Sequence, residues 1–363
     1  MKVGLIAALV LSLVANAYLG TRFFLEHQTE QSRDINAALR TLQDRNKDGD
    51  SRAGPSDQPD ASVSAADFSG RQTLPPAGYA NLLLKNVRFY WTDAIFADVE
   101  LANATLKSSS ADGLVDFDAP QQLEIHLQRA RVGMDYSVLE GMMNGPVFGH
   151  GTSHVRNMKM DSIPDPDGPG SLLRIRGELE LITWLDFEML ASVQAGQNRD
   201  LLVKAQQIES LGLPFVKGLM GSVGLELESL IVPAKGSGVF VQGNTIRISL
   251  PEFFPSPRVV ADVESVDVQD KGLLIAMKGK AASAADMRRL PDPSARHYLY
   301  AAGRFVKFGP LRLIATSLQM IDTSPEDPFH FHMQKYFRQL DRSRARVQLD
   351  GRVRVWLLDY DKL

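Results

Sequence analysis

The chain has 363 residues, of which 44% are hydrophobic and 23% are charged, and its formal net charge is -3 at pH 7. This length and apolar content suffice for one large or two ordinary domains, and the slightly acidic balance gives no case for nucleic-acid binding, which normally goes with a basic excess. Because the sequence contains no cysteine, disulfides, thiolate metal sites and thiol nucleophiles are excluded.

The N-terminus begins with an uncharged apolar segment. Lys2 precedes a run without charge from Val3 to Leu19, and apolar residues continue to Leu25. Residues 1–25 therefore predict either a single-pass anchor in the inner membrane or a signal peptide that is cleaved after Ala17. We favour the anchor, because aromatic and apolar residues continue past the cleavage motif. Both interpretations place the body in the periplasm or another extracytoplasmic space.

Two segments separate this N-terminus from the body. Residues 26–45 are good helix formers with Ile35, Leu39 and Leu42 at helical spacing, which predicts a helical stalk. Residues 46–81 are rich in Asp, Ser, Gly, Pro and Ala and almost free of large apolar residues. Such a composition cannot offset the entropy of ordering, so it predicts a flexible linker. The folded body, residues 82–363, follows.

Alternating apolar and polar residues dominate the body and predict strands. The pattern is clearest at Leu123, Ile125 and Leu127, which alternate with Glu, His and Gln. Two stretches break it with helical spacing, at Tyr136–Met143 and at residues 329–340. Further strands are expected around residues 87–91, 99–101, 173–193, 259–277 and 305–313, with a terminal hairpin that turns at Asp350-Gly351.

The most organised stretch runs from Ser210 to Pro257. Apolar residues at three- and four-residue steps predict a helix from about Pro214 to Ile231, and a hairpin around Gly243-Asn244 follows. The predicted fold class is therefore α+β, with one long helix wrapped by a highly curved antiparallel sheet. The apolar face of this helix comprises Val216, Leu219, Met220, Val223, Leu227 and Leu230.

The residues that could carry catalysis or bind metal form no recognisable site. Histidines 126, 150, 154, 297, 330 and 332 have no partner at a ligand spacing, and we interpret them as surface or turn residues. The start of a calcium loop at Asp44–Asp50 fails at Pro55, where a bidentate Glu belongs. We therefore expect no enzyme activity, no metal and no cofactor.

The apolar faces supply the best argument about function. A curved sheet on a long helix either fills its interior with side chains or leaves a groove for acyl chains, and periodicity does not distinguish the two. If a groove exists, its walls are expected to include the six helix residues above. The other expected lining residues are Met142, Phe187, Met189, Ile275 and Met277.

The order of these segments resembles the LmeA-like bacterial lipid-binding family. The resemblance rests on GMDYSVLEGMMN, on LGLPFVKGLMGSVGLELESLI and on the hairpin, Pro-flanked bend and strand pair from Gly236 to Gly279. That family is similar to the tubular lipid-binding (TULIP) class, so the resemblance implies a TULIP-like body at residues 82–363 that binds phospholipid or another amphiphile. The alternative hypothesis is a non-enzymatic envelope scaffold or assembly factor with a filled core.

Overall fold

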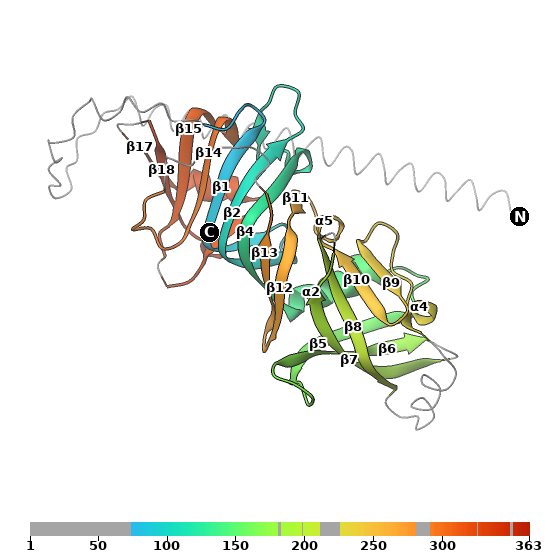
Figure 1. Ribbon diagram of the computed structural model, residues 1–363. Helices are drawn as coiled ribbons and strands as arrows, with labels where there is room; N and C mark the ends of the chain where they lie inside the picture. Colours follow the sequence, from blue (N-terminus) through green and yellow to red (C-terminus); the bar gives the residue numbers. More distant parts are fainter. Residues whose placement is uncertain are drawn as a thin grey trace, which may run out of the picture. The chain divides into compact units, whose positions relative to one another are not determined.

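The computed structural model describes residues 74–180, 183–197, 199–210, 226–280, 291–324, 326–348 and 351–363 (Figure 1). Of these residues, 56% lie in strands and 12% are helical. Within the described part, α2 (Tyr136–Met142) is the one helix that reaches seven residues. The predicted α+β fold, in which a sheet wraps a long helix, is therefore wrong, and the described body is mainly β.

The structure describes only the C-terminal end of the predicted long helix. Strand β8 ends at Ser210, and helix α4 (Leu227–Leu230) is only four residues long. Helix α4 stops there because Pro233 disfavours a helical conformation at Val232. Residues 211–225, with Val216, Leu219, Met220 and Val223, lie outside the described residues.

The larger sheet has twelve strands, nine of them in the order β12-β13-β4-β2-β1-β14-β15-β18-β17. Three short strands join it by parallel pairing, since β11 pairs with β4, β16 with β1, and β3 with β14. The strands are β1 (Tyr79–Tyr90), β2 (Phe96–Ser108), β3 (Val115–Asp116), β4 (Leu123–Asp135), β11 (Arg258–Val260), β12 (Asp262–Gln269), β13 (Gly272–Lys278), β14 (Tyr298–Phe308), β15 (Leu311–Asp322), β16 (Phe329–His332), β17 (Arg344–Val347) and β18 (Val353–Leu357).

A backbone irregularity at Asn86, which we call a bulge although the β1–β2 register is unchanged across it, determines which side chains of β1 face the core. Ala80, Leu82 and Leu84 are buried before it, whereas Val87 and Phe89 are buried after it. Because strand side chains alternate with a period of two, an uninterrupted strand would turn the second set to the opposite face. Asn86 has φ of 48°, the left-handed conformation that Asn tolerates, and the bulge returns both sets to the same face.

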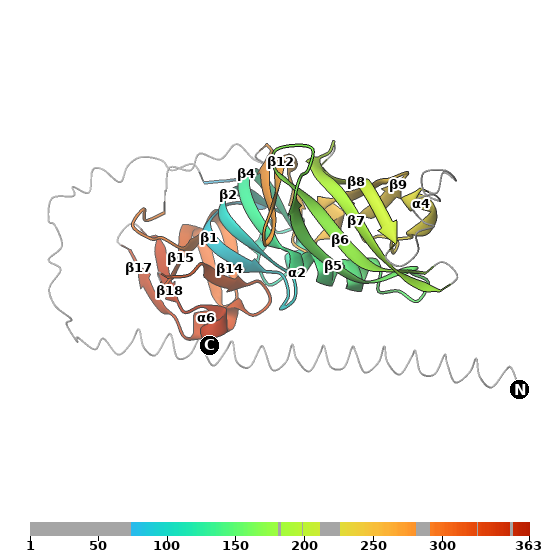
Figure 2. The same cartoon turned by 90° about the horizontal axis from the view of Figure 1, so that it is seen from below.

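The two neighbouring strands show the same change of parity. In β2 the buried apolar side chains lie at odd-numbered positions up to Val99 and at even-numbered positions from Ala102 onward. In β4 they change between Leu127 and Ala130. The β2–β4 register shifts at both places. Bulges in three adjacent strands, which lie side by side in Figures 1 and 2, increase the local twist and bend of this part of the sheet.

The smaller sheet has six antiparallel strands in the order β5-β6-β7-β8-β10-β9. Helix α2 is tied to its edge strand through polar contacts. The Glu140 carboxylate accepts the Met160 N–H at 2.7 Å, and the Asn144 side chain exchanges two hydrogen bonds with the Met158 backbone. The strands are β5 (Val155–Pro164), β6 (Ser171–Glu180), β7 (Trp184–Ala195), β8 (Asp200–Ser210), β9 (Val239–Gln242) and β10 (Thr245–Ser249).

Short helices and turns connect the strands. One main cluster of buried apolar residues includes side chains from both sheets. A small second cluster lies around Tyr298, Tyr300 and Ile321. The remaining helical segments are η2 (Pro120–Gln122), η3 (Met143–Val147), α5 (Leu250–Phe253), α6 (Tyr336–Asp341) and η4 (Tyr360–Lys362).

Several local predictions are confirmed. The predicted helix at Tyr136–Met143 is α2, and the hairpins around Gly243 and Gly351 are β9–β10 and β17–β18. The helix expected over residues 329–340 is wrong, since this stretch forms β16 and then the shorter α6. The folded part begins before Leu82, because β1 starts at Tyr79.

The role of Asn86 can be tested by substitution. Asn86→Val places a β-branched residue at positive φ, and we expect it to lower the free energy of unfolding by about 1–3 kcal/mol. Asn86→Gly should stay within about 1 kcal/mol of the wild type, because Gly accepts this φ and only the hydrogen bond to the Arg296 carbonyl is lost. Urea denaturation measures both. Thr245→Val, in an ordinary strand, is the control, and an equal loss there would contradict the account.

Candidate functional site

An apolar cavity of about 60 Å³ lies against the bulged strands of the larger sheet. All fifteen lining residues are apolar or aromatic. They come from four adjacent strands and from the segment that includes α5 and β11. They are Leu84, Phe89 and Trp91 near β1, Ala97, Val99 and Ala102 on β2, Ile125, Leu127, Val132 and Met134 on β4, Ile275 and Met277 on β13, and Leu250, Phe254 and Val259.

The bulges bring these side chains to one wall. Each bulged strand contributes residues from both sides of its irregularity, as Val99 and Ala102 do on β2 and Leu127 and Val132 do on β4. Without these irregularities, one half of each strand would present its polar positions here. The cavity thus lies where the sheet bends.

The opposite wall is fixed by a proline-bracketed segment. Pro251 stands at the start of α5, where a missing N–H costs nothing, and Pro255 ends the helix by keeping Phe254 extended. Gly238 approaches α5 closely, since a Cβ atom there would lie 2.6 Å from the Phe253 nitrogen. Strand β11 then pairs with the first half of β4, which places Val259 at the cavity.

Aromatic rings close one side of the cavity. Trp91 stacks on Phe254 with ring centroids 5.1 Å apart, and Phe89 meets Trp91 edge to face at 4.9 Å. The Trp91 indole N–H is buried and has no hydrogen-bond acceptor among the described residues. A buried donor without a partner is costly, so the packing of the rings has to outweigh that cost.

The predicted lining residues divide into three groups. Ile275 and Met277 line the cavity. Met142, Phe187, Met189 and Leu227 are buried in the main core but lie outside the cavity lining, and Leu230 is half-buried against that core. The four predicted residues between 216 and 223 lie outside the described residues.

The sequence interpretation missed the lining residues on β1 and β2. Alternation had predicted strands at both places, but the change of parity at Asn86 and after Val99 hides the common face. The signal that could have revealed it is the spacing of three between Leu84 and Val87 and between Val99 and Ala102, with a polar or charged residue inside each interval.

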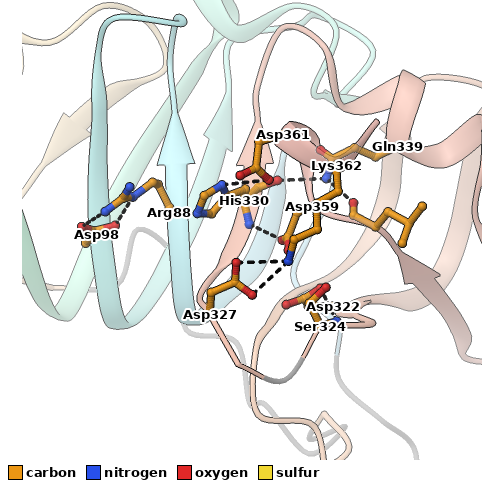
Figure 3. A network of polar contacts seen from close by, with 11 residues as sticks. Arg88, Asp98, Asp322, Ser324, Asp327, His330, Gln339, Asp359, Asp361 and Lys362 are labelled. Carbon is orange, nitrogen blue, oxygen red and sulfur yellow. Dashed lines mark hydrogen bonds and ion pairs between the residues drawn. The ribbon is translucent and has the colours of Figure 1, made fainter.

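A polar cluster lies elsewhere, around the C-terminus (Figure 3). Asp322, Asp327 and Asp359 each offer a carboxylate oxygen within 4.8 Å of the others. The Lys362 ammonium donates to Asp359 at 2.8 Å and to both Asp327 oxygens at 3.1 Å, and the buried Asp359 also accepts the His330 N–H at 2.8 Å. We assign no metal to this cluster, because Lys362 already neutralises two of its carboxylates.

Asp322 is the member of the cluster that Lys362 does not contact directly. Burial, reinforced by the charges of Asp359 and Asp327, raises the pKa of its carboxyl to about 7. The hydrogen bond from Lys362 instead lowers the pKa of Asp327. Asp322 also borders an open groove of about 550 Å³ with Asp292, His297 and Trp356, but its Oδ2 atom is buried and has no hydrogen-bond partner in the described part of the chain.

His332 differs from its predicted place on the surface or in a turn, since its side chain is fully buried in β16. Its Nε2 atom lies 3.0 Å from Asp93 Oδ1, and its Nδ1 atom accepts the Gln334 N–H at 3.2 Å. Tyr90 stacks parallel to the imidazole. Burial lowers the pKa of His332, and both ring nitrogens are engaged, so this histidine is suited to holding β1 and β16 together.

Among the described residues, no helix has the length and apolar character needed to cross a membrane. The predicted anchor, residues 1–25, lies outside them, as do the stalk and most of the linker.

Comparison of the chain with protein-family models, curated proteins and solved structures gave no match.

The cavity predicts opposite results for two alanines on the same face of β2. Ala102→Leu adds side-chain atoms that the cavity accommodates, so the free energy of unfolding should stay the same or rise by up to about 1 kcal/mol. Ala104→Leu, at a buried position outside the lining, should lower it by about 1–3 kcal/mol through overpacking. Chemical denaturation measures both, and equal losses would show that no space exists beside Ala102.

The Asp322 carboxyl predicts a pH-dependent difference in stability. Its pKa is raised from 3.8 to about 7, so the folded state binds the proton more tightly and this group lowers stability as pH rises from 4 to 7. Asp322→Asn removes that effect. As pH rises from 4 to 7, its free energy of unfolding should therefore increase by roughly 1–3 kcal/mol relative to that of the wild type. Asp327→Asn should show no such trend between pH 4 and 7, because that pKa is lowered from 3.8 and its contribution to stability changes only below about pH 4. Denaturation midpoints measured at several pH values test this prediction. If the difference in stability between Asp322→Asn and the wild type does not change with pH, the assignment is contradicted.

Proposed function

We propose that this chain binds the apolar part of a lipid or another amphiphile in the cavity between the bulged strands and α5. The observation that carries the proposal is a lining of fifteen residues without a charged side chain, on a sheet that is bent at this point. Ligand sites of this kind are concave and mostly apolar, whereas a solid core leaves few voids larger than a water molecule.

The size of the cavity limits what it holds. At about 60 Å³ it has room for roughly four to six water-sized groups, which matches the end of an acyl chain. Burial of four methylenes contributes about 3 kcal/mol, which alone gives only millimolar affinity. Tight binding of a whole lipid therefore requires further contacts outside the cavity.

The proposed role is to hold an amphiphile, not to transform it. The described residues that line the cavity include no acid, base or nucleophile. An N-terminal anchor at residues 1–25 would keep such a binder at the inner membrane, with its body in the periplasm, where it would serve lipid transport or envelope maintenance. The competing function is an envelope scaffold with a filled core, and the small size of the cavity favours it.

The two functions differ in whether the cavity takes up an acyl chain. Purified full-length wild-type protein should bind the fluorescent fatty acid cis-parinaric acid saturably. Ala102→Leu fills the cavity and should weaken that binding by about tenfold or more, which is 1.4 kcal/mol. Leu101→Phe is the matched control. It adds bulk at the neighbouring position of β2, whose side chain is exposed on the opposite face.

If the wild type and Ala102→Leu bind the probe equally, the cavity is rejected as the site. Binding would then come from a part of the protein that both variants share, such as an N-terminal anchor. Absence of saturable binding by the folded wild type, together with a loss of stability in Ala102→Leu, would favour the scaffold with a filled core. Mass spectrometry of organic extracts from the same preparations identifies any lipid that copurifies with the wild type and not with Ala102→Leu.

A further inference from the structure

The face of the larger sheet opposite the cavity carries a group of arginines at its β14–β15 and β17–β18 end. On β15, Leu313 faces the main core, so its neighbours Arg312 and Ile314 point to the opposite face. On β17, Arg344 and Arg346 pair with Trp356 and Arg354, which alternate with the core residues Val355 and Leu357. We call this side the outer face.

Four of these cations have no acidic partner in the described part of the chain. Arg304, Arg312, Arg344 and Arg346 are all exposed, and none forms an ion pair with a described residue. Nearby acidic groups are already paired, since Asp292 binds Arg354 at 2.9 Å and Asp116 and Asp118 bind Lys307. Within the described residues, the outer face therefore presents positive charge without an acidic partner, although the whole chain has a net charge of -3.

Exposed apolar side chains lie beside Arg304 and Arg312, whereas Arg344 and Arg346 lie farther along the sheet, at the level of Ile321 and Gln319 of β15. Ile314 is 70% exposed and is paired across the strands with Phe305, which is 37% exposed. Arg304 precedes Phe305 in the chain, and Arg312 lies on the same face as Ile314. Arginines without described partners, on one face with an exposed apolar pair, suit a surface that is anionic and apolar just below its charges, which describes a bilayer that contains acidic lipids.

We propose that the outer face around Arg304, Phe305, Arg312, Ile314, Arg344 and Arg346 docks on an anionic lipid bilayer. The arginines contact the headgroups, and Ile314 and Phe305 enter the interface. This contact is independent of the cavity and of whether the cavity binds an amphiphile. It would orient the body on the membrane surface by a second attachment besides any N-terminal anchor.

The absence of cysteine allows a direct test in the full-length protein. Ile314→Cys, labelled with an environment-sensitive fluorophore, reports on this position alone, even when another segment anchors the chain. We expect the emission to shift to shorter wavelength in vesicles of phosphatidylcholine with phosphatidylglycerol, and not in phosphatidylcholine alone. The shift should disappear at about 1 M salt, where the Debye length falls to about 3 Å.

Two controls separate this face from general attraction to the membrane. The label at Val232→Cys, an exposed position near α4, should not shift. Combined Arg312→Glu and Arg346→Glu should abolish the Ile314 shift, whereas combined Lys204→Glu and Lys235→Glu, with the same change in net charge, should leave it intact. The proposal is overturned if the Ile314 label does not shift, shifts equally without phosphatidylglycerol, or responds to duplex DNA in place of anionic vesicles.

Discussion

The described structure depends on one constraint, which is that a strand must keep its apolar side chains on one face even where the sheet bends. Strands β1, β2 and β4 satisfy it by inserting an irregularity at which the buried positions change parity. At Asn86 a left-handed backbone allows the change. Without such irregularities, either the sheet would be flatter or half of each strand would turn polar residues into the core.

The cavity is a consequence of the same constraint. Side chains on both sides of each bulge converge on the bend, and the cavity lies between them. The segment from Leu250 to Val260, shaped by Pro251 and Pro255, covers the bend without filling it. The outer face of the sheet is separate from this arrangement and carries arginines where the inner face carries aliphatic residues. The proposed acyl-chain site and the proposed membrane-docking face therefore belong to opposite sides of one sheet.

Local patterns in the sequence predicted local structure well. Strict alternation identified β4 and β13, and the change to helical spacing identified α2. The stretch from Phe329 to Leu340 shows the limit, because its aromatic residues fit a strand at the start and a helix at the end, and the structure contains both. The fold class was wrong because a pattern of apolar residues specifies which face is buried but not what covers it.

The site was predicted only in part for a related reason. Ile275 and Met277 lie on a regular strand, so their common face could be read from the sequence. Phe89, Val99 and Ala102 lie beside bulges, where a spacing of three resembles an interruption and not a continued face. The covering segment is distant in sequence from β1 and β2, and only tertiary structure brings Phe254 onto Trp91.

The central claim is that the space beside Ala102, Leu127 and Phe254 receives an acyl chain. A crystal structure of the protein with a fatty acid brominated near its methyl end tests this claim most directly, because bromine is located by its anomalous scattering. The account predicts an anomalous peak inside the cavity that Ala102→Leu abolishes. A peak that lies only elsewhere on the protein, or one that persists in Ala102→Leu, would contradict it.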